Sequence, residues 1–107
     1  MSERIEITDA RGTRVVAVDG ELLVLGSGEG CEVRLAQPGL QPRHLRFVRT
    51  DRGYRVEPVR AGATVAVNGE DLFCKDLEPG DRIEVAGLQL RWHADAVVRQ
   101  AAASLRT

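Results

Sequence analysis

Short runs in which apolar and polar residues alternate occupy most of the chain, and they constrain its fold more than any other feature. Residues 88–92 are the clearest case, because Leu88, Leu90 and Trp92 alternate with glutamine and arginine. Successive side chains of a strand point to opposite faces, so this pattern predicts a strand with one buried face. Turn residues recur about every eight to twelve positions, as in sandwiches and barrels. The sequence therefore predicts an all-β domain.

Turn dipeptides and prolines set the expected order of the strands. Asn68-Gly69 and Asp19-Gly20 are typical of tight turns. Residues 36–43 contain Pro38 and Pro42, which cannot donate to a sheet ladder, so this segment is expected to be a surface loop. The expected strands are residues 4–7, 13–18, 22–25, 31–35, 45–47, 54–56, 64–67, 83–85 and 88–92. In residues 31–35 the face formed by Cys31, Val33 and Leu35 is expected to be buried.

Size and charge exclude several classes of protein. With 107 residues and a formal net charge of -1, the chain fits one compact domain with one core. Its arginines are interleaved with acids, so the basic field of a nucleic-acid binder is missing and no nucleic-acid partner is expected. No apolar run approaches the roughly 18 to 20 residues of a membrane-spanning helix, and no signal-peptide pattern is present. We therefore expect no membrane insertion and a cytoplasmic location, and the arginine-rich composition favours a bacterial origin.

Neither the cysteines nor the histidines form a pattern that indicates catalysis, a metal or a cofactor. Cys31 and Cys74 are expected to be reduced and buried, since free cysteine packs like a small hydrophobic residue. They would not make a metal site with His44 and His93. His44 is expected to be a structural histidine that bonds its own loop, and His93 to be solvated. We expect no enzyme activity.

The glycine-rich turn at residues 26–30 does not predict a nucleotide site. Phosphate-binding loops precede a helix, whereas a strand is expected here, and Glu29 would repel phosphate.

Six motifs together resemble the forkhead-associated (FHA) family in order and spacing. They are Leu25-Gly26-Ser27, Cys31-Glu32-Val33-Arg34-Leu35, Pro42-Arg43-His44, Gly53-Tyr54-Arg55-Val56, Val67-Asn68-Gly69 and Leu77-Glu78-Pro79-Gly80-Asp81-Arg82-Ile83. The resemblance covers roughly residues 5–93. It implies a SMAD/FHA-type β-sandwich of about eleven strands, whose loops at one end recognise phosphothreonine peptides. Residues 1–93 are then the FHA-like domain, and residues 94–107, with apolar residues spaced four apart, are expected to be a helical tail or a linker.

The chain departs from the family where phosphate is held. In members that bind phosphothreonine, an arginine follows the first glycine, a serine and an arginine precede the histidine, and an asparagine and a threonine lie further on. The equivalent positions here are Ser27, Gln41, Pro42, Ala63 and Val65. Each hydrogen bond to a charged phosphate contributes roughly 1.5 to 3 kcal/mol, so the missing donors would cost about 5 kcal/mol, or several thousand-fold in affinity.

By contrast, the scaffold positions of the family match. They are Gly26, His44, Tyr54, Asn68, Gly69, Gly80 and Asp81. The resemblance thus implies a preserved fold with a degenerate anion site.

Three hypotheses follow for the function. The first is a non-catalytic protein-protein interaction module that docks a protein or peptide without phosphate, within a larger bacterial protein or assembly. The second is a signalling domain that still binds phosphothreonine through a rewired pocket, with Arg43 and Arg60 as substitute cations. The third is a structural domain of a secretion or envelope apparatus. The candidate partner-binding residues are Ser27, Gly28, Gln41, Pro42, Arg43, Arg60, Ala63 and Asn68, in or near the loops 26–30, 36–43 and 59–63.

Overall fold

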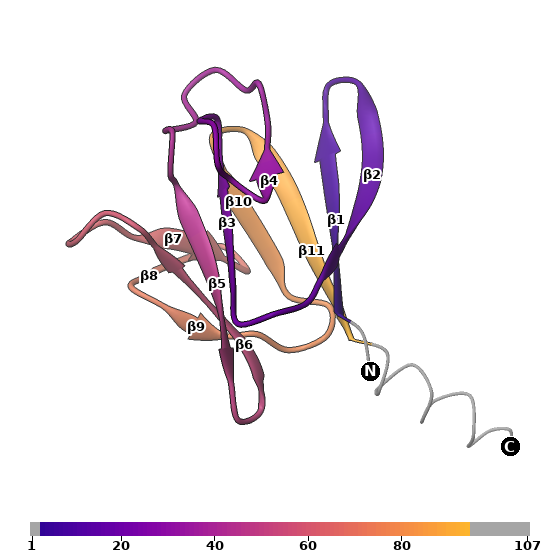
Figure 1. Ribbon diagram of the computed structural model, residues 1–107, viewed down its shortest axis with the longest axis vertical. Coiled ribbons are helices and arrows are strands. Elements are labelled where there is room, and N and C mark those ends of the chain that lie inside the picture. The colour runs from indigo at the N-terminus through magenta and orange to yellow at the C-terminus, as the bar shows by residue number, and fades with distance from the viewer. Residues whose placement is uncertain (1–2, 95–107) are drawn as a thin grey trace, which may run out of the picture.

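A computed structural model describes residues 3–94, which form eleven strands and no helix (Figure 1). The strands are β1 (Glu3–Asp9), β2 (Gly12–Val18), β3 (Leu22–Gly26), β4 (Val33–Arg34), β5 (Leu45–Thr50), β6 (Gly53–Pro58), β7 (Val65–Val67), β8 (Glu70–Leu72), β9 (Lys75–Asp76), β10 (Arg82–Val85) and β11 (Leu88–Ala94). The all-β prediction is confirmed, and so is the number of about eleven strands that the family resemblance implies; the alternation alone predicted nine of them.

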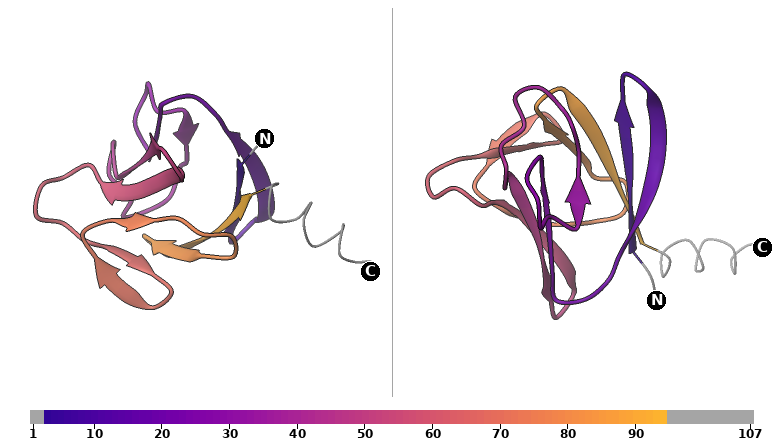
Figure 2. Two further views of the ribbon diagram at one scale, coloured as in Figure 1. Left: turned by 90° about the horizontal axis from the view of Figure 1, so that it is seen from below. Right: turned by 45° about the horizontal axis from the view of Figure 1, so that its top comes forward.

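The strands form two sheets that face each other as the layers of a sandwich (Figure 2). One sheet has six strands in the order β2-β1-β11-β10-β7-β8, and the other has five in the order β4-β3-β5-β6-β9. Neighbouring strands are antiparallel except β3 and β4, which are parallel. The β7–β8 hairpin turns at Asn68-Gly69, where that dipeptide predicts a tight turn. The β1–β2, β5–β6 and β10–β11 pairs are also hairpins.

An aromatic cluster joins the two sheets at the centre of the core. Trp92, on β11, is 2% exposed. Its ring is stacked on Phe47 of β5 with 6.1 Å between ring centroids, and it meets Tyr54 of β6 edge-on at 5.5 Å. The Tyr54 hydroxyl donates a hydrogen bond of 2.8 Å to the carbonyl of Gly20. These contacts fix how one layer lies on the other.

A buried carboxylate fixes the turn before β10. Asp81 accepts hydrogen bonds from Lys75 Nζ at 2.7 Å, from the Glu78 amide at 2.9 Å and from Asn68 Nδ2 at 3.0 Å. Burial acts to raise the pKa of Asp81, but the three hydrogen bonds and the charge of Lys75 outweigh it and hold that pKa below its ordinary value. The ionised carboxylate therefore stabilises the fold.

The structure corrects several expectations about single residues. The cysteines are free, but the expectation that both are buried is wrong, because Cys31 is half-buried and Cys74 is exposed. Cys31 precedes β4, which has only two residues, so the alternation does not extend to it. His93 is half-buried instead of solvated, with its Nε2 3.0 Å from Glu6 Oε1 on the neighbouring strand.

Strand β11 also runs further than expected. It includes Ala94, whereas the tail was expected to begin at that residue. Residues 95–107, the rest of the expected helical tail or linker, lie outside the described residues.

The aromatic cluster gives a first prediction. Trp92→Ala should lower the free energy of unfolding by about 3 to 5 kcal/mol, because it leaves a cavity between the sheets. Urea unfolding followed by circular dichroism measures this change. The matched control is Leu22→Ala, whose side chain is 49% exposed and whose loss should cost far less. A cost below about 1 kcal/mol for the tryptophan variant would contradict the core assignment.

The buried carboxylate gives a prediction of pH dependence. Asp81→Asn should lower the free energy of unfolding at neutral pH by about 1 to 3 kcal/mol, because Lys75 and the Glu78 amide lose an anionic acceptor. Since the pKa of Asp81 is lower in the folded than in the unfolded chain, its contribution is lost as the pH falls below the unfolded value of about 3.9 and through the folded value.

The difference between wild type and Asp81→Asn should therefore shrink in acid, whereas the exposed control Asp71→Asn should remain near wild type throughout. Unfolding curves recorded across this pH range test both statements, and a difference that persists unchanged in acid would contradict them.

Candidate functional site

Backbone hydrogen bonds tie the β3–β4 loop to the β4–β5 loop at one end of the sandwich. The Ser27 amide donates to the Gln41 carbonyl at 2.9 Å, and the Gly28 amide donates to the Pro42 carbonyl at 3.1 Å. At Gly26 a Cβ atom would collide with the Pro42 carbonyl, so only glycine fits there. We call these two contacting segments, residues 26–28 and 40–42, the loop latch.

Polar side chains beside the loop latch also bond to its backbone. The Ser27 hydroxyl donates to the Leu40 carbonyl at 3.0 Å. The Cys31 thiol donates to the Pro42 carbonyl at 3.0 Å. Arg34 Nε donates to the Ser27 carbonyl at 3.3 Å. The Ser27 hydroxyl, the Cys31 thiol and Nε of Arg34 are therefore already engaged with carbonyl oxygens of the protein.

His44 stabilises the latch in its neutral form. Its Nδ1 accepts a hydrogen bond of 3.1 Å from the Gln41 amide, and its own amide donates to the Leu25 carbonyl at 2.9 Å. Burial lowers the pKa of His44, since the charged imidazolium is poorly solvated there. An imidazolium would also have no lone pair for the Gln41 amide. The expectation of a structural histidine that bonds its own loop is confirmed.

The third loop, between β6 and β7, is tied to the same end of the sandwich only at its base. The Val59 amide donates to the His44 carbonyl at 3.1 Å. Further on, the Ala63 amide bonds the Arg60 carbonyl at 3.2 Å across a turn in which Gly62 has a φ of 81°. In Figure 1 this loop extends to the left, away from the other two loops at the top. Arg60 and Ala63 thus belong to this end of the molecule but not to the latch.

Charges of both signs lie around the loops. Arg43 and Arg60 are exposed, and so are Glu29 and Glu32. The pKa of Glu32 is lowered chiefly by the hydrogen bond that its carboxylate accepts from the Val24 amide at 2.8 Å, and further by the charge of Arg43. The field of Arg43 is therefore partly balanced by an acid.

Asn68 does not join these loops. It lies at the opposite end of β7 from the β6–β7 loop, in the turn before β8. Its side chain bonds Asp81 at 3.0 Å and accepts from the Arg82 amide at 2.9 Å. Asn68 thus fixes a turn, with Gly69 beside it at a φ of 85°. The structure brings together Ser27, Gly28, Gln41 and Pro42, with Arg43 next to them.

Some of the contacts at these loops could not be predicted from the sequence. The Leu40 carbonyl and the Cys31 thiol belong to contacts between loops, and a single sequence does not reveal such contacts. Within residues 3–94 no three side chains of histidine, cysteine, aspartate or glutamate gather as a metal site requires. The same part of the chain contains no helix long and apolar enough to span a bilayer.

Comparison with known proteins agrees with this geometry. The family model of the FHA domain matches residues 23–86. A solved structure from work on phosphothreonine-dependent FHA domain interactions superposes with a TM-score of 0.78 at 19% identity, covering 88% of this chain and 97% of that one.

Two further solved structures are similar. The FHA domain of the CT664 protein from Chlamydia trachomatis gives a TM-score of 0.78 at 13% identity, covering 88% of this chain and 98% of that one. The FhaA FHA domain, solved in complex with the intracellular domain of Rv3910, gives 0.76 at 20% identity, covering 86% of this chain and 100% of that one. No curated protein sequence gives a significant match.

The family match spans more than half of the 107 residues, and the described strands build the same sandwich as these structures. FHA domains are non-catalytic protein-interaction modules that typically bind phosphothreonine peptides. From its matched residues and its fold, this chain belongs to the FHA domain family.

Proposed function

We propose that this FHA domain docks a protein or peptide without needing a phosphate group, because its phosphothreonine site is degenerate. The observation that carries the proposal is the loop latch, in which the Ser27 hydroxyl and the amides of Ser27 and Gly28 all bond carbonyl oxygens. The neutral side chains at positions 27, 41, 42, 63 and 65 add no cation. Binding within a larger bacterial protein or assembly, and a cytoplasmic location, stay predictions.

Physical magnitudes favour this proposal over a rewired phosphate pocket. A phosphate group loses much hydration on binding, and only charge-assisted hydrogen bonds of good geometry offset that loss. The charge of Arg43 helps to lower the pKa of Glu32, so an acid already partly balances it. Arg60 lies on the β6–β7 loop, which extends away from the latch. Two exposed arginines on separate loops contribute roughly 0.2 to 1 kcal/mol each to an ion pair, which does not replace a bidentate clamp.

Titration with phosphothreonine peptides tests the proposal. Labelled protein should show no saturable, phosphate-dependent amide shifts in residues 26–30, 36–43 and 59–63 at peptide concentrations up to about 1 mM. The matched control is the same peptide with an unmodified threonine. Saturable shifts in these loops with the phosphorylated peptide alone would contradict the proposal and establish the rewired pocket.

Restoring the side chains of the family tests whether only the pocket is lost. The combined variant Ser27→Arg, Gln41→Ser, Pro42→Arg and Ala63→Asn should gain phosphothreonine affinity by about a hundredfold or more, since several charge-assisted hydrogen bonds return. The same titration measures the gain, and Arg52→Gln serves as a control variant far from the loops. An unchanged affinity in a folded variant would mean that the loops themselves have a different shape.

A further inference from the structure

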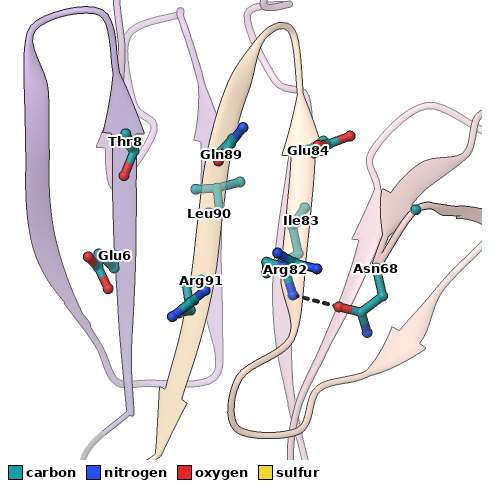
Figure 3. Close-up of a pocket in the computed structure, with 10 residues that line it drawn as sticks. Glu6, Thr8, Asn68, Arg82, Ile83, Glu84, Gln89, Leu90 and Arg91 are labelled. Carbon is teal, nitrogen blue, oxygen red and sulfur yellow. Dashed lines mark hydrogen bonds between the residues drawn. The ribbon is translucent and has the colours of Figure 1, made fainter.

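The outer face of the six-stranded sheet has a hollow of about 460 Å³ that the loops do not reach. It lies over β1, β11 and β10, with the β7–β8 turn at its edge (Figure 3). Its outward side chains are Glu6, Thr8, Arg82, Glu84, Gln89 and Arg91. Ile83 and Leu90, which alternate with them, are 1% exposed and face the core. The hollow is therefore polar and open to solvent.

Strand register orders these side chains into two rows across the sheet. Arg91 of β11 lies opposite Glu6 of β1 on one side and opposite Arg82 of β10 on the other. In the next row along the strands, Gln89 lies between Thr8 and Glu84. Figure 3 shows the two rows as separate levels of the same face. Rows on one face are two residues apart, which is about 7 Å.

Two arginines stand side by side in the first row, and neither forms an ion pair with an acid of the described residues. Like charges directly opposite each other on neighbouring strands are destabilising. Within residues 3–94 the guanidinium groups of Arg82 and Arg91 make no hydrogen bond or ion pair. Glu6, the acid in this row, has its carboxylate 3.0 Å from His93 Nε2. An anion placed between the two arginines would offset their repulsion.

The second row has the opposite character. The carboxylate of Glu84 has no hydrogen bond or ion pair among the described residues, and the side chain of Gln89 beside it offers an amide. A ligand that is anionic over Arg82 and Arg91 should therefore be cationic about 7 Å further along the strands. Alternate side chains of an extended peptide have this spacing, and they point to one side.

We infer that this sheet face binds an extended segment of a protein partner, with a carboxylate side chain between Arg82 and Arg91 and a lysine or arginine two residues away over Glu84. The inference rests on the proposed docking function and adds to it a surface and a partner chemistry. Charge complementarity favours this occupant. The first row is positive at Arg82 and Arg91, the second is negative at Glu84, and the distance between the rows matches that between alternate side chains of an extended peptide.

A synthetic peptide with this pattern tests the inference. Gly-Ser-Thr-Asp-Thr-Lys-Thr-Ser-Gly should produce saturable amide shifts in β10 and β11 of the labelled protein. Arg82→Gln with Arg91→Gln should weaken its binding by about tenfold, because two ion pairs are lost. The control pair Arg11→Gln and Arg52→Gln removes the same charge from other exposed positions and should leave binding unchanged. Raising the salt to about 0.5 M should also weaken binding.

Exchanging the charges of protein and peptide separates a loss of binding from a loss of folding, because a misfolded variant would bind neither peptide. With Arg82→Glu and Arg91→Glu, a peptide with the aspartate replaced by lysine should bind more tightly than the original peptide. Equal binding of both peptides, or no saturable shift in β10 and β11 with wild-type protein, would overturn the inference. Shifts confined to the loops would overturn it but leave the proposed function standing, whereas a phosphothreonine peptide that binds the loops would overturn the proposed function alone.

Discussion

Two backbone hydrogen bonds between neighbouring loops, from Ser27 to Gln41 at 2.9 Å and from Gly28 to Pro42 at 3.1 Å, hold one end of the sandwich together. They form because Gly26 lets the β3–β4 loop lie directly against the Pro42 carbonyl. The same contact directs these amide groups toward carbonyl oxygens of the protein, so they could donate to a ligand only if the loops separated. Stability and binding thus compete for the same donors at this end of the molecule.

The side chains at the loops also favour the closed contact between them. Neutral His44 stabilises the latch as an acceptor, and the charge of Arg43 is partly balanced by Glu32, whose pKa it helps to lower. The scaffold itself depends on other contacts, namely the Trp92 cluster between the sheets and the Asp81 carboxylate beside β10. A phosphate site can therefore be lost from the loops without loss of the fold, and a binding surface can lie elsewhere on the same scaffold.

Alternation and turn residues predicted much of the fold, because most of the longer strands have one buried face. β11 and the β5–β6 hairpin are examples, whereas β2, in which only Val18 is buried, is an exception. β8 and β9 have three and two residues, too few for an alternation to show. The apolar face expected at residues 31–35 is buried only at Val33 and Leu35, because β4 is so short.

The candidate site was less predictable from the sequence. Motif order indicated candidate loop positions, and the structure brings Ser27, Gly28, Gln41 and Pro42 together. The sequence did not reveal that Asn68 lies apart from the loops, nor that Arg82 and Arg91 are neighbours. Those facts depend on hydrogen-bond partners and on strand register, and residues nine positions apart become neighbours only when β10 and β11 pair.

The central claim is that the loops no longer hold an oxyanion, and a crystal structure tests it most directly. Crystals soaked in concentrated inorganic phosphate or in a phosphothreonine peptide should show no tetrahedral density between the loops at residues 26–30, 36–43 and 59–63. A phosphate held there by Ser27, Arg43 or Arg60 would contradict the account.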